Sequence, residues 1–258
     1  MIPVLNPVRL VMGVLFLLTA CTKDPVINLP APPVSANMIT KVEKDGDTWE
    51  TSYNGNGSVQ NLIRKLADGS VMARYDFVYE NGKLLEVNST GKWKYFYNGN
   101  LISAVETYNN LGSLRYRTEF AYTNDKMTEK TEYYANVTIP LKPIRRTRYL
   151  YTAEGNVSVK EFYEYVNATW TKTEELHVVK YDTNPNTSEH LENFPFLPKS
   201  YYSVNNPLRE NYTDSNGQPY GLVLHEYIYD VYGRPGSRKS TYSYLGFPDT
   251  HSEAKFYY

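Results

Sequence analysis

The chain of 258 residues contains one cysteine and only four histidines, and the histidines are scattered. One cysteine cannot form an internal disulfide, and no two histidines have the spacing of a His-x-x-x-His metal site. The 27 basic and 28 acidic residues nearly cancel, so net charge gives no reason to expect a nucleic acid partner. Nucleotide-binding and nucleophile-elbow motifs are also missing. No metal, cofactor or nucleic acid is therefore predicted.

Long apolar runs are rare as well, and the clearest one, "LVMGVLFLL", follows Arg9. It is too short to span a bilayer and is typical of an export signal. The next residues, Leu18-Thr19-Ala20-Cys21, resemble the lipobox of bacterial lipoproteins. The resemblance implies a signal peptide over residues 1–20 and a lipid on Cys21, which would attach the protein to a membrane. The alternative is an ordinary secretory signal in which Cys21 is incidental.

Residues 21–37 are predicted to be the acylated cysteine and a tether, because four prolines interrupt this stretch. Such a segment favours extended polyproline conformation, with a reach of roughly 3.1 Å per residue. "Cys-Thr-Lys-Asp" resembles in part the signal that sends some Bacteroidetes lipoproteins to the outer leaflet. The resemblance implies a lipid-anchored protein of the outer membrane, with cell-surface exposure or a periplasmic position left open.

What the sequence has in excess is tyrosine, 26 residues in all, and it is arranged with a period of two. In "RYDFVYENGKLLEV", Tyr75, Phe77 and Tyr79 share one strand face while Arg74 and Asp76 take the other. Asn-Gly follows directly, and that dipeptide between alternating runs is a strong hairpin signal. The stretch therefore predicts two antiparallel strands with one aromatic face.

The same unit recurs along residues 38–258, which we predict to be a single β domain. A tyrosine precedes each of eight turns: Tyr53, Tyr79, Tyr97, Tyr122, Tyr151, Tyr181, Tyr212 and Tyr229. A second class of turn, exemplified by Asp68-Gly69 and Leu111-Gly112, joins the units. The pattern predicts an all-β, antiparallel up-and-down meander of about sixteen strands with few or no helices. Residues 58–69 have helical spacing when considered alone, but internal repetition favours a strand there.

A sheet with one aromatic face and no helices must bury that face against itself, so we expect a soluble, closed or flattened β-barrel. A membrane barrel with its aromatics facing lipid is the alternative. It is disfavoured because Glu161 interrupts the face shared by Val157, Val159, Tyr163 and Tyr165. Tyrosines also run the whole length of the strands instead of forming two girdles.

"YDFVYENGKLLEV" and "YIYDVYGRPGSRKSTYSY" resemble the YD repeats of RHS-type proteins. They are still more similar to a group of Bacteroidetes lipoproteins of unknown function with a porin-like fold. The resemblance covers residues 40–258, although several units lack the Tyr-Asp dipeptide. It implies a porin-like barrel in the cell envelope and supplies no catalytic residues.

A proline-rich insertion near residues 184–207 breaks the repeat and contains Phe194 and Phe196. Long loops in compact domains are often functional. The insertion is expected either to cover the barrel mouth with its phenylalanines or to bind a ligand, with Trp170 offering a flat face for a sugar. "DGD" at 45–47 and "DSNG" at 214–217 resemble calcium loops but are explained equally well as turns.

The sequence therefore favours a non-catalytic binding or scaffold module that captures a glycan or another small ligand through aromatics at the barrel mouth. Trp170, Phe194 and Phe196 are the candidate ligand-binding residues. The alternative is a purely structural or cell-surface interaction protein with a tyrosine-rich core and an envelope protein as partner. An enzyme is not predicted, because convergent polar groups cannot be identified; a pocket with two carboxylates and a bound ion would favour one.

Overall fold

The computed structural model describes residues 38–136, 139–186, 196 and 203–258, and these form an all-β domain. The strands are β1 (Lys41–Lys44), β2 (Asp47–Tyr53), β3 (Val59–Lys65), β4 (Val71–Glu80), β5 (Lys83–Asn88), β6 (Lys92–Asn98), β7 (Leu101–Tyr108), β8 (Leu114–Thr123), β9 (Lys126–Tyr134), β10 (Lys142–Tyr151), β11 (Val157–Val166), β12 (Thr169–Pro185), β13 (Asn205–Asp214), β14 (Pro219–Tyr229), β15 (Pro235–Tyr244) and β16 (Thr250–Tyr257).

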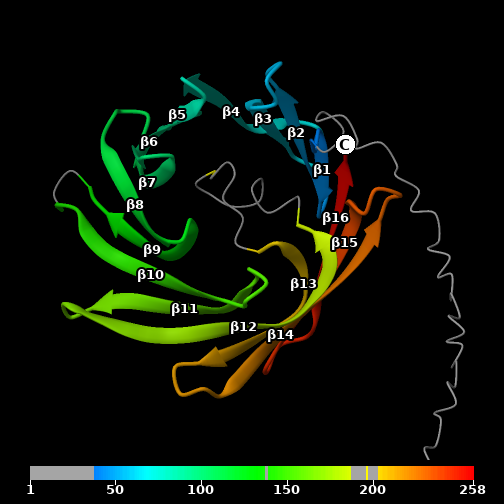
Figure 1. The fold of residues 1–258 in the computed structure, drawn as a ribbon. Coiled ribbons are helices and arrows are strands. Elements are labelled where there is room, and N and C mark those ends of the chain that lie inside the picture. The colour runs from blue at the N-terminus through cyan, green and yellow to red at the C-terminus, as the bar shows by residue number, and fades with distance from the viewer. Residues whose placement is uncertain (1–37, 137–138, 187–195, 197–202) are drawn as a thin grey trace, which may run out of the picture. The chain divides into compact units, whose positions relative to one another are not determined.

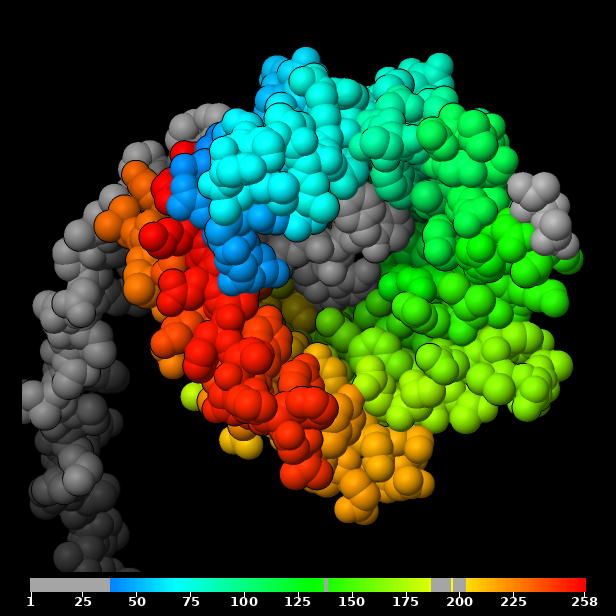
Figure 2. All heavy atoms as spheres, turned by 180° about the vertical axis from the view of Figure 1, so that it is seen from behind, coloured from blue at the N-terminus to red at the C-terminus, as the bar shows by residue number. Residues whose placement is uncertain are grey.

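Each strand pairs antiparallel with the strands before and after it in the sequence, and β1 pairs with β16 to close the barrel (Figure 1). The first and last strands consequently lie side by side on the surface (Figure 2). At this seam Val42 faces Phe256, and both side chains are buried. The predicted closed meander of sixteen strands is confirmed, and residues 59–65 form strand β3, as the internal repeat indicates.

The turns that follow the even-numbered strands lie at one end of the barrel, which we call the tyrosine end. There a tyrosine on one strand donates its hydroxyl hydrogen to a carbonyl near the start of the preceding strand. Six such bonds are Tyr53 to Ile39, Tyr97 to Leu84, Tyr122 to Ile102, Tyr151 to Met127, Tyr181 to Val157 and Tyr258 to Pro235, with O···O distances of 2.6–3.1 Å. The recurring tyrosine is therefore a repeated clamp between neighbouring strands, not only a core residue.

Two of the predicted repeat tyrosines depart from this rule. Tyr212 was expected to precede a turn of the same class, but the turn between β13 and β14 lies at the opposite end of the barrel. Tyr258 makes the clamp that completes the series at the C-terminus. Tyr229 precedes a turn at the tyrosine end, as predicted, but it donates to the carboxylate of Asp182 rather than to a carbonyl.

The inner face of the barrel is largely apolar along β3 to β11, apart from Lys130, Glu132, Arg145 and Glu164 on β9 to β11, and we call this region the aromatic half. Its cluster contains the buried residues Leu62, Leu84, Val87, Tyr95, Ile102, Val105, Phe120, Met127, Tyr149, Val157 and Phe196, with partly buried aromatics such as Tyr75, Phe77 and Trp93 packed against them. Phe196 comes from the connection between β12 and β13, and its ring lies 5.5 Å from Tyr75 and 5.2 Å from Phe77. A barrel of sixteen strands is too wide for its own side chains to fill, so a residue from a connection helps to occupy it.

The inner face along β12 to β16 is different, and we call it the polar half. It carries Glu174, Glu210, His225, Arg238 and Ser240, which the strand registers place on the same side of the sheet as buried Leu176, Val223 and Ala254. A tyrosine group, formed by Tyr212, Tyr220 and Tyr244, packs beside them with ring centroids 5.9–6.3 Å apart. This half is held by hydrogen bonds as well as by burial.

The outer face carries ion pairs between and along strands. Arg117 contacts Glu106 at 2.7 Å, Arg148 contacts Glu129 at 3.1 Å, and Lys172 contacts Glu175 at 2.7 Å. Val157, which was predicted to share a face with Val159, is instead completely buried, because the β10–β11 register shifts between Leu150 and Tyr151. No helix in the described part of the chain is long and apolar enough to cross a membrane.

Candidate functional site

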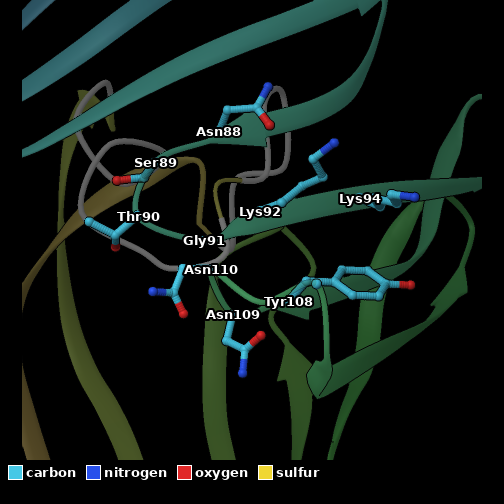
Figure 3. A pocket seen from close by; sticks show the side chains of 10 residues that line it. Asn88, Ser89, Thr90, Gly91, Lys92, Lys94, Tyr108, Asn109 and Asn110 are labelled. Atoms are coloured by element: carbon cyan, nitrogen blue, oxygen red, sulfur yellow. The ribbon is translucent and has the colours of Figure 1, made fainter.

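A polar pocket of about 420 Å³ lies at the end of the barrel opposite the tyrosine end, and we call it the rim pocket (Figure 3). It is built by the turn from β5 to β6, the first residues of β6 and the turn from β7 to β8. Its lining residues are Asn88, Ser89, Thr90, Gly91, Lys92, Lys94, Tyr108, Asn109, Asn110 and Gly112. Amide, hydroxyl and ammonium groups and one aromatic ring thus line the pocket, and no carboxylate is among the lining residues.

The floor of the rim pocket depends on a close approach between two turns. A Cβ on Gly91 would lie 2.3 Å from the carbonyl oxygen of Tyr108, so only glycine allows the two chains to come this near. On the other turn, the side-chain oxygen of Asn109 accepts hydrogen bonds from the backbone N–H groups of Leu111 and Ser113. These contacts fix both walls, and the pocket is therefore formed before any ligand arrives.

Tyr108 and Lys94 extend to the same side of the rim pocket (Figure 3). The Tyr108 hydroxyl donates to Glu106 at 2.5 Å, and this hydrogen bond, together with burial and the negative charge, raises the pKa of Tyr108 to about 12. The phenol is therefore neutral across the physiological range and its ring is held in place. The Lys94 ammonium lies 5.3 Å from the centroid of that ring, a favourable cation–π distance.

A second cavity, of about 360 Å³, is lined partly by the inner faces of β9 to β12. It contains the carboxylates of Glu132, Glu164 and Glu174, which is the kind of convergence that an enzyme needs. Glu132, however, is paired with Lys130 at 2.9 Å, and Glu174 accepts the hydroxyl hydrogen of Tyr220. Two of the three carboxylates are thus already bound to neighbouring side chains. We therefore consider the rim pocket the better candidate for a ligand-binding site.

Glu210, His225 and Ser240 form a hydrogen-bonded chain across β13, β14 and β15. His225 Nδ1 lies 2.8 Å from Ser240 Oγ, and His225 Nε2 lies 3.4 Å from Glu210 Oε2. Burial works to raise the pKa of Glu210, but the hydrogen bond from His225 and the charges of Lys160 and Arg238 outweigh it, and the pKa is lowered. Ser240 is only 1% exposed, so its hydroxyl is not presented to a substrate as a nucleophile must be.

The structure does not bring the predicted ligand-binding residues together. Trp170 lies at the start of β12 on the outer face, half-buried, with Arg146 stacked 4.2 Å from its ring and Tyr165 5.0 Å away. Phe196 is 3% exposed inside the aromatic half, as expected of a covering residue. It can meet a ligand only if that ligand enters the barrel. Phe194 and Cys21 lie outside the described residues.

The two calcium-like stretches are turns held by their own carboxylates. Asp214 accepts hydrogen bonds from the backbone N–H groups of Asn216 and Gln218. Asp45 accepts from the N–H of Glu253 and the hydroxyl of Ser252 on the neighbouring strand. Among the residues that the structure describes, no three His, Cys, Asp or Glu side chains are grouped to hold a metal ion.

Sequence reasoning missed the rim pocket. Along β6 the inward Trp93 and Tyr95 alternate with the outward Lys92 and Lys94. The available signal was the polar run "NSTGKWK", in which a turn rich in hydroxyl and amide groups leads directly into two outward lysines. Nothing local could place Tyr108 beside them, since the β6–β7 register brings it there.

No protein-family model and no curated protein matches the chain. A solved structure of a porin-like protein from Bacteroides uniformis is similar, with a TM-score of 0.60, 13% identity, and coverage of 85% of this chain and 96% of that one. A porin-like protein from Bacteroides vulgatus has a TM-score of 0.47 at 13% identity, over 85% of this chain and 98% of its own. The first likeness confirms the expected porin-like fold; at such identity it carries no statement about ligand or chemistry.

Proposed function

We propose that this protein is an outer-membrane lipoprotein, anchored through an acylated Cys21, whose barrel is a non-catalytic module that captures a glycan at the rim pocket. The observation that carries the proposal is the lining of that pocket. Amide and hydroxyl groups can both donate to and accept from sugar hydroxyls, and the ring of Tyr108 offers a flat apolar face. A preformed cleft with a few placed polar groups is the usual form of a small-ligand site.

The charged outer face supports a barrel that lies outside the hydrocarbon core of the membrane. Ion pairs such as Arg117–Glu106 and Arg148–Glu129 stand on the outward faces of β7 to β10. Charged groups on the lipid-facing surface of a membrane barrel cost about 2–4 kcal/mol at the midplane for Arg or Lys. We therefore assign attachment to the lipid on Cys21 and not to the strands.

The state of the carboxyl groups supports a binding role over a catalytic one. A general acid at neutral pH requires a carboxyl whose pKa is raised by its surroundings. In the described part of the chain, every carboxyl whose pKa departs from its ordinary value has a lowered pKa, through hydrogen bonds or nearby cations. These groups are suited to accept hydrogen bonds, not to donate protons.

Glycan capture is tested by calorimetric titration of the full-length protein in detergent with neutral oligosaccharides of several sugar classes. We expect at least one class to bind, and Tyr108→Ala and Asn110→Ala to weaken that binding about tenfold, the typical effect of losing one good polar or stacking contact. Asn216→Ala, in an exposed turn at the same end, is the matched control. If no sugar binds, or the pocket variants bind like the control, the barrel is a structural or protein-interaction module instead.

The anchor is tested separately by expressing the wild type and Cys21→Ser in a bacterial host fed a palmitate analogue. We expect the wild type to be labelled and to sediment with membranes, and the variant to be unlabelled and released, because a lipid chain supplies most of the membrane affinity. Protease treatment of intact cells then distinguishes the surface from the periplasm. A labelled or membrane-bound Cys21→Ser protein would contradict the proposed anchor.

A further inference from the structure

We propose, on the basis of the glycan site proposed above, that the rim pocket selects an acidic sugar, one that carries a carboxylate or a sulfate group. The first observation is the state of Lys94. Strand register places Glu106 on β7 and Glu86 on β5 opposite it. The Glu106 carboxylate is already engaged by Arg117 at 2.7 Å and by the Tyr108 hydroxyl at 2.5 Å, and Glu86 contacts Lys92. Among the described residues no carboxylate forms an ion pair with Lys94.

Lys92 adds a second cation to the same pocket. Its ammonium contacts Glu86 at 3.0 Å, and both side chains are partly exposed, at 42% and 29%. An ammonium has three hydrogens, so one contact with Glu86 leaves donors for a ligand. Glu86 itself does not line the pocket, and neither does any other acidic residue. The lining itself therefore carries two lysines and no carboxylate, while Glu86 and Glu106 lie beside it on β5 and β7.

A comparison with the interior cavity indicates why lysines without carboxylates in the lining favour an anionic ligand. There Lys130 and Arg145 stand among three glutamates, and Lys130 is paired with Glu132. Lys130 is thus neutralised by a carboxylate of the same lining, whereas the lining of the rim pocket holds no carboxylate that could neutralise Lys94. A charge-assisted hydrogen bond is about twice as strong as a neutral one, so a ligand with a negative group gains most at the rim pocket.

The neutral part of the lining indicates what the rest of the ligand must be. Asn88, Asn110, Ser89 and Thr90 offer amides and hydroxyls around the two lysines. A bare inorganic anion would use only the ammonium groups and leave these unused. A sugar ring with several hydroxyls and one acidic substituent uses both sets and can lie against Tyr108, which makes a uronic acid or a sulfated sugar the matching chemistry.

The proposal is tested with two ligands of equal length, an oligogalacturonate and its fully methyl-esterified form, in which uncharged methyl esters replace the carboxylates. We expect the charged oligomer to bind the full-length protein about tenfold more tightly at low salt, the effect of one charge-assisted contact. The difference should shrink as salt is raised, since exposed charges are screened. A sulfated oligosaccharide and its desulfated form provide a second pair.

Lys94→Gln is expected to abolish most of the preference for the charged ligand, while Lys94→Arg preserves it. Lys239→Gln, an exposed lysine on β15, is the control and should change nothing. Equal binding of charged and neutral oligomers, or a preference that survives Lys94→Gln, overturns the acidic-sugar inference but leaves glycan capture standing. Failure of both members of every pair to bind removes the glycan site itself, and tight binding of sulfate ion alone would identify an inorganic anion site.

Discussion

The two halves of the barrel interior are filled by different kinds of side chain. The aromatic half, along β3 to β11, fills its share of the lumen with rings and aliphatic side chains, and Phe196 is added from a connection. The polar half, along β12 to β16, uses Glu210, His225 and Ser240 joined by hydrogen bonds. The first is stabilised by burial, which depends little on pH, while the second depends on charge and geometry. Substitutions in the two halves should therefore differ in how their effect on the free energy of unfolding depends on pH.

The largest effect is expected for Phe196→Ala in the aromatic half. The side chain is 3% exposed, and removing a buried phenylalanine typically costs about 3–5 kcal/mol of unfolding free energy. Phe247→Ala is the control, because that ring is 74% exposed and should change stability by less than about 0.5 kcal/mol. Urea unfolding followed by tryptophan fluorescence measures both, and equal stability of the two variants would show that Phe196 does not support the interior.

The second largest loss of unfolding free energy is expected for Glu210→Gln, which affects only the polar half. It removes the negative charge that faces His225, Lys160 and Arg238, at a cost of about 1.5–3 kcal/mol at pH 7, the range for a hydrogen bond to a charged group. Because the pKa of Glu210 is lowered in the folded protein, its stabilisation is present above the unfolded value near 4.3 and is lost as the pH falls through the folded value.

The difference in unfolding free energy between wild type and Glu210→Gln should therefore narrow below about pH 4. Glu226→Gln, an exposed residue on the neighbouring strand β14, is the control, and Phe196→Ala should show no comparable narrowing. Urea titrations at several pH values make the comparison. A gap that stays constant down to pH 3 would mean that the charge of Glu210 does not support this half.

A pair of tyrosine substitutions should have opposite signs within the aromatic half. Tyr122→Phe removes a clamp to the carbonyl of Ile102, at a cost of about 1 kcal/mol. Tyr95 is 5% exposed, and among the described residues no protein group pairs with its hydroxyl, so Tyr95→Phe should be neutral or stabilising by up to about 1 kcal/mol. Thermal and urea unfolding of both variants measure the two changes in stability. A destabilised Tyr95→Phe variant would show that the Tyr95 hydroxyl has a hydrogen-bond partner.

The smallest effect is expected on the outer face. Arg74 and Asp76 form an ion pair at 2.9 Å, but both side chains are more than half exposed. Surface pairs of this kind contribute little because water and salt screen them. Arg74→Ala should shift the urea midpoint no more than a substitution at exposed Lys239 does. A clear loss would show that the charged exterior, and not only the interior, holds the barrel closed.

Much of the architecture could be predicted from residues 38–258 because it is encoded locally. The alternation of Tyr75, Phe77 and Tyr79 assigned the inner face of β4, and Asn81-Gly82 placed the following turn, where both residues have positive φ. The two wrong predictions concern positions whose placement depends on the register between strands. A bulge turned Val157 inward away from Val159, and Tyr212 was assigned to the wrong end because its turn resembles the others in composition.

The candidate site was not predictable in the same way. Trp170 was chosen for its flat ring, but its stacking on Arg146 could not be known from the sequence. Lys94 and Tyr108 are separated by a whole turn and are brought together only by the pairing of β6 with β7. The engagement of Glu106 by Arg117, which leaves Lys94 without a carboxylate, depends on the next strand as well.

The sequence by itself determined that this chain is a meander of hairpins with rings turned inward, since a two-residue period and positive-φ turns are properties of neighbouring residues. Tertiary structure alone decided which tyrosines clamp which carbonyls, that one half of the lumen is polar, and that a rim pocket exists whose lining holds two lysines and no carboxylate. Each of those features joins residues on different strands, and a single bulge is enough to change the partners.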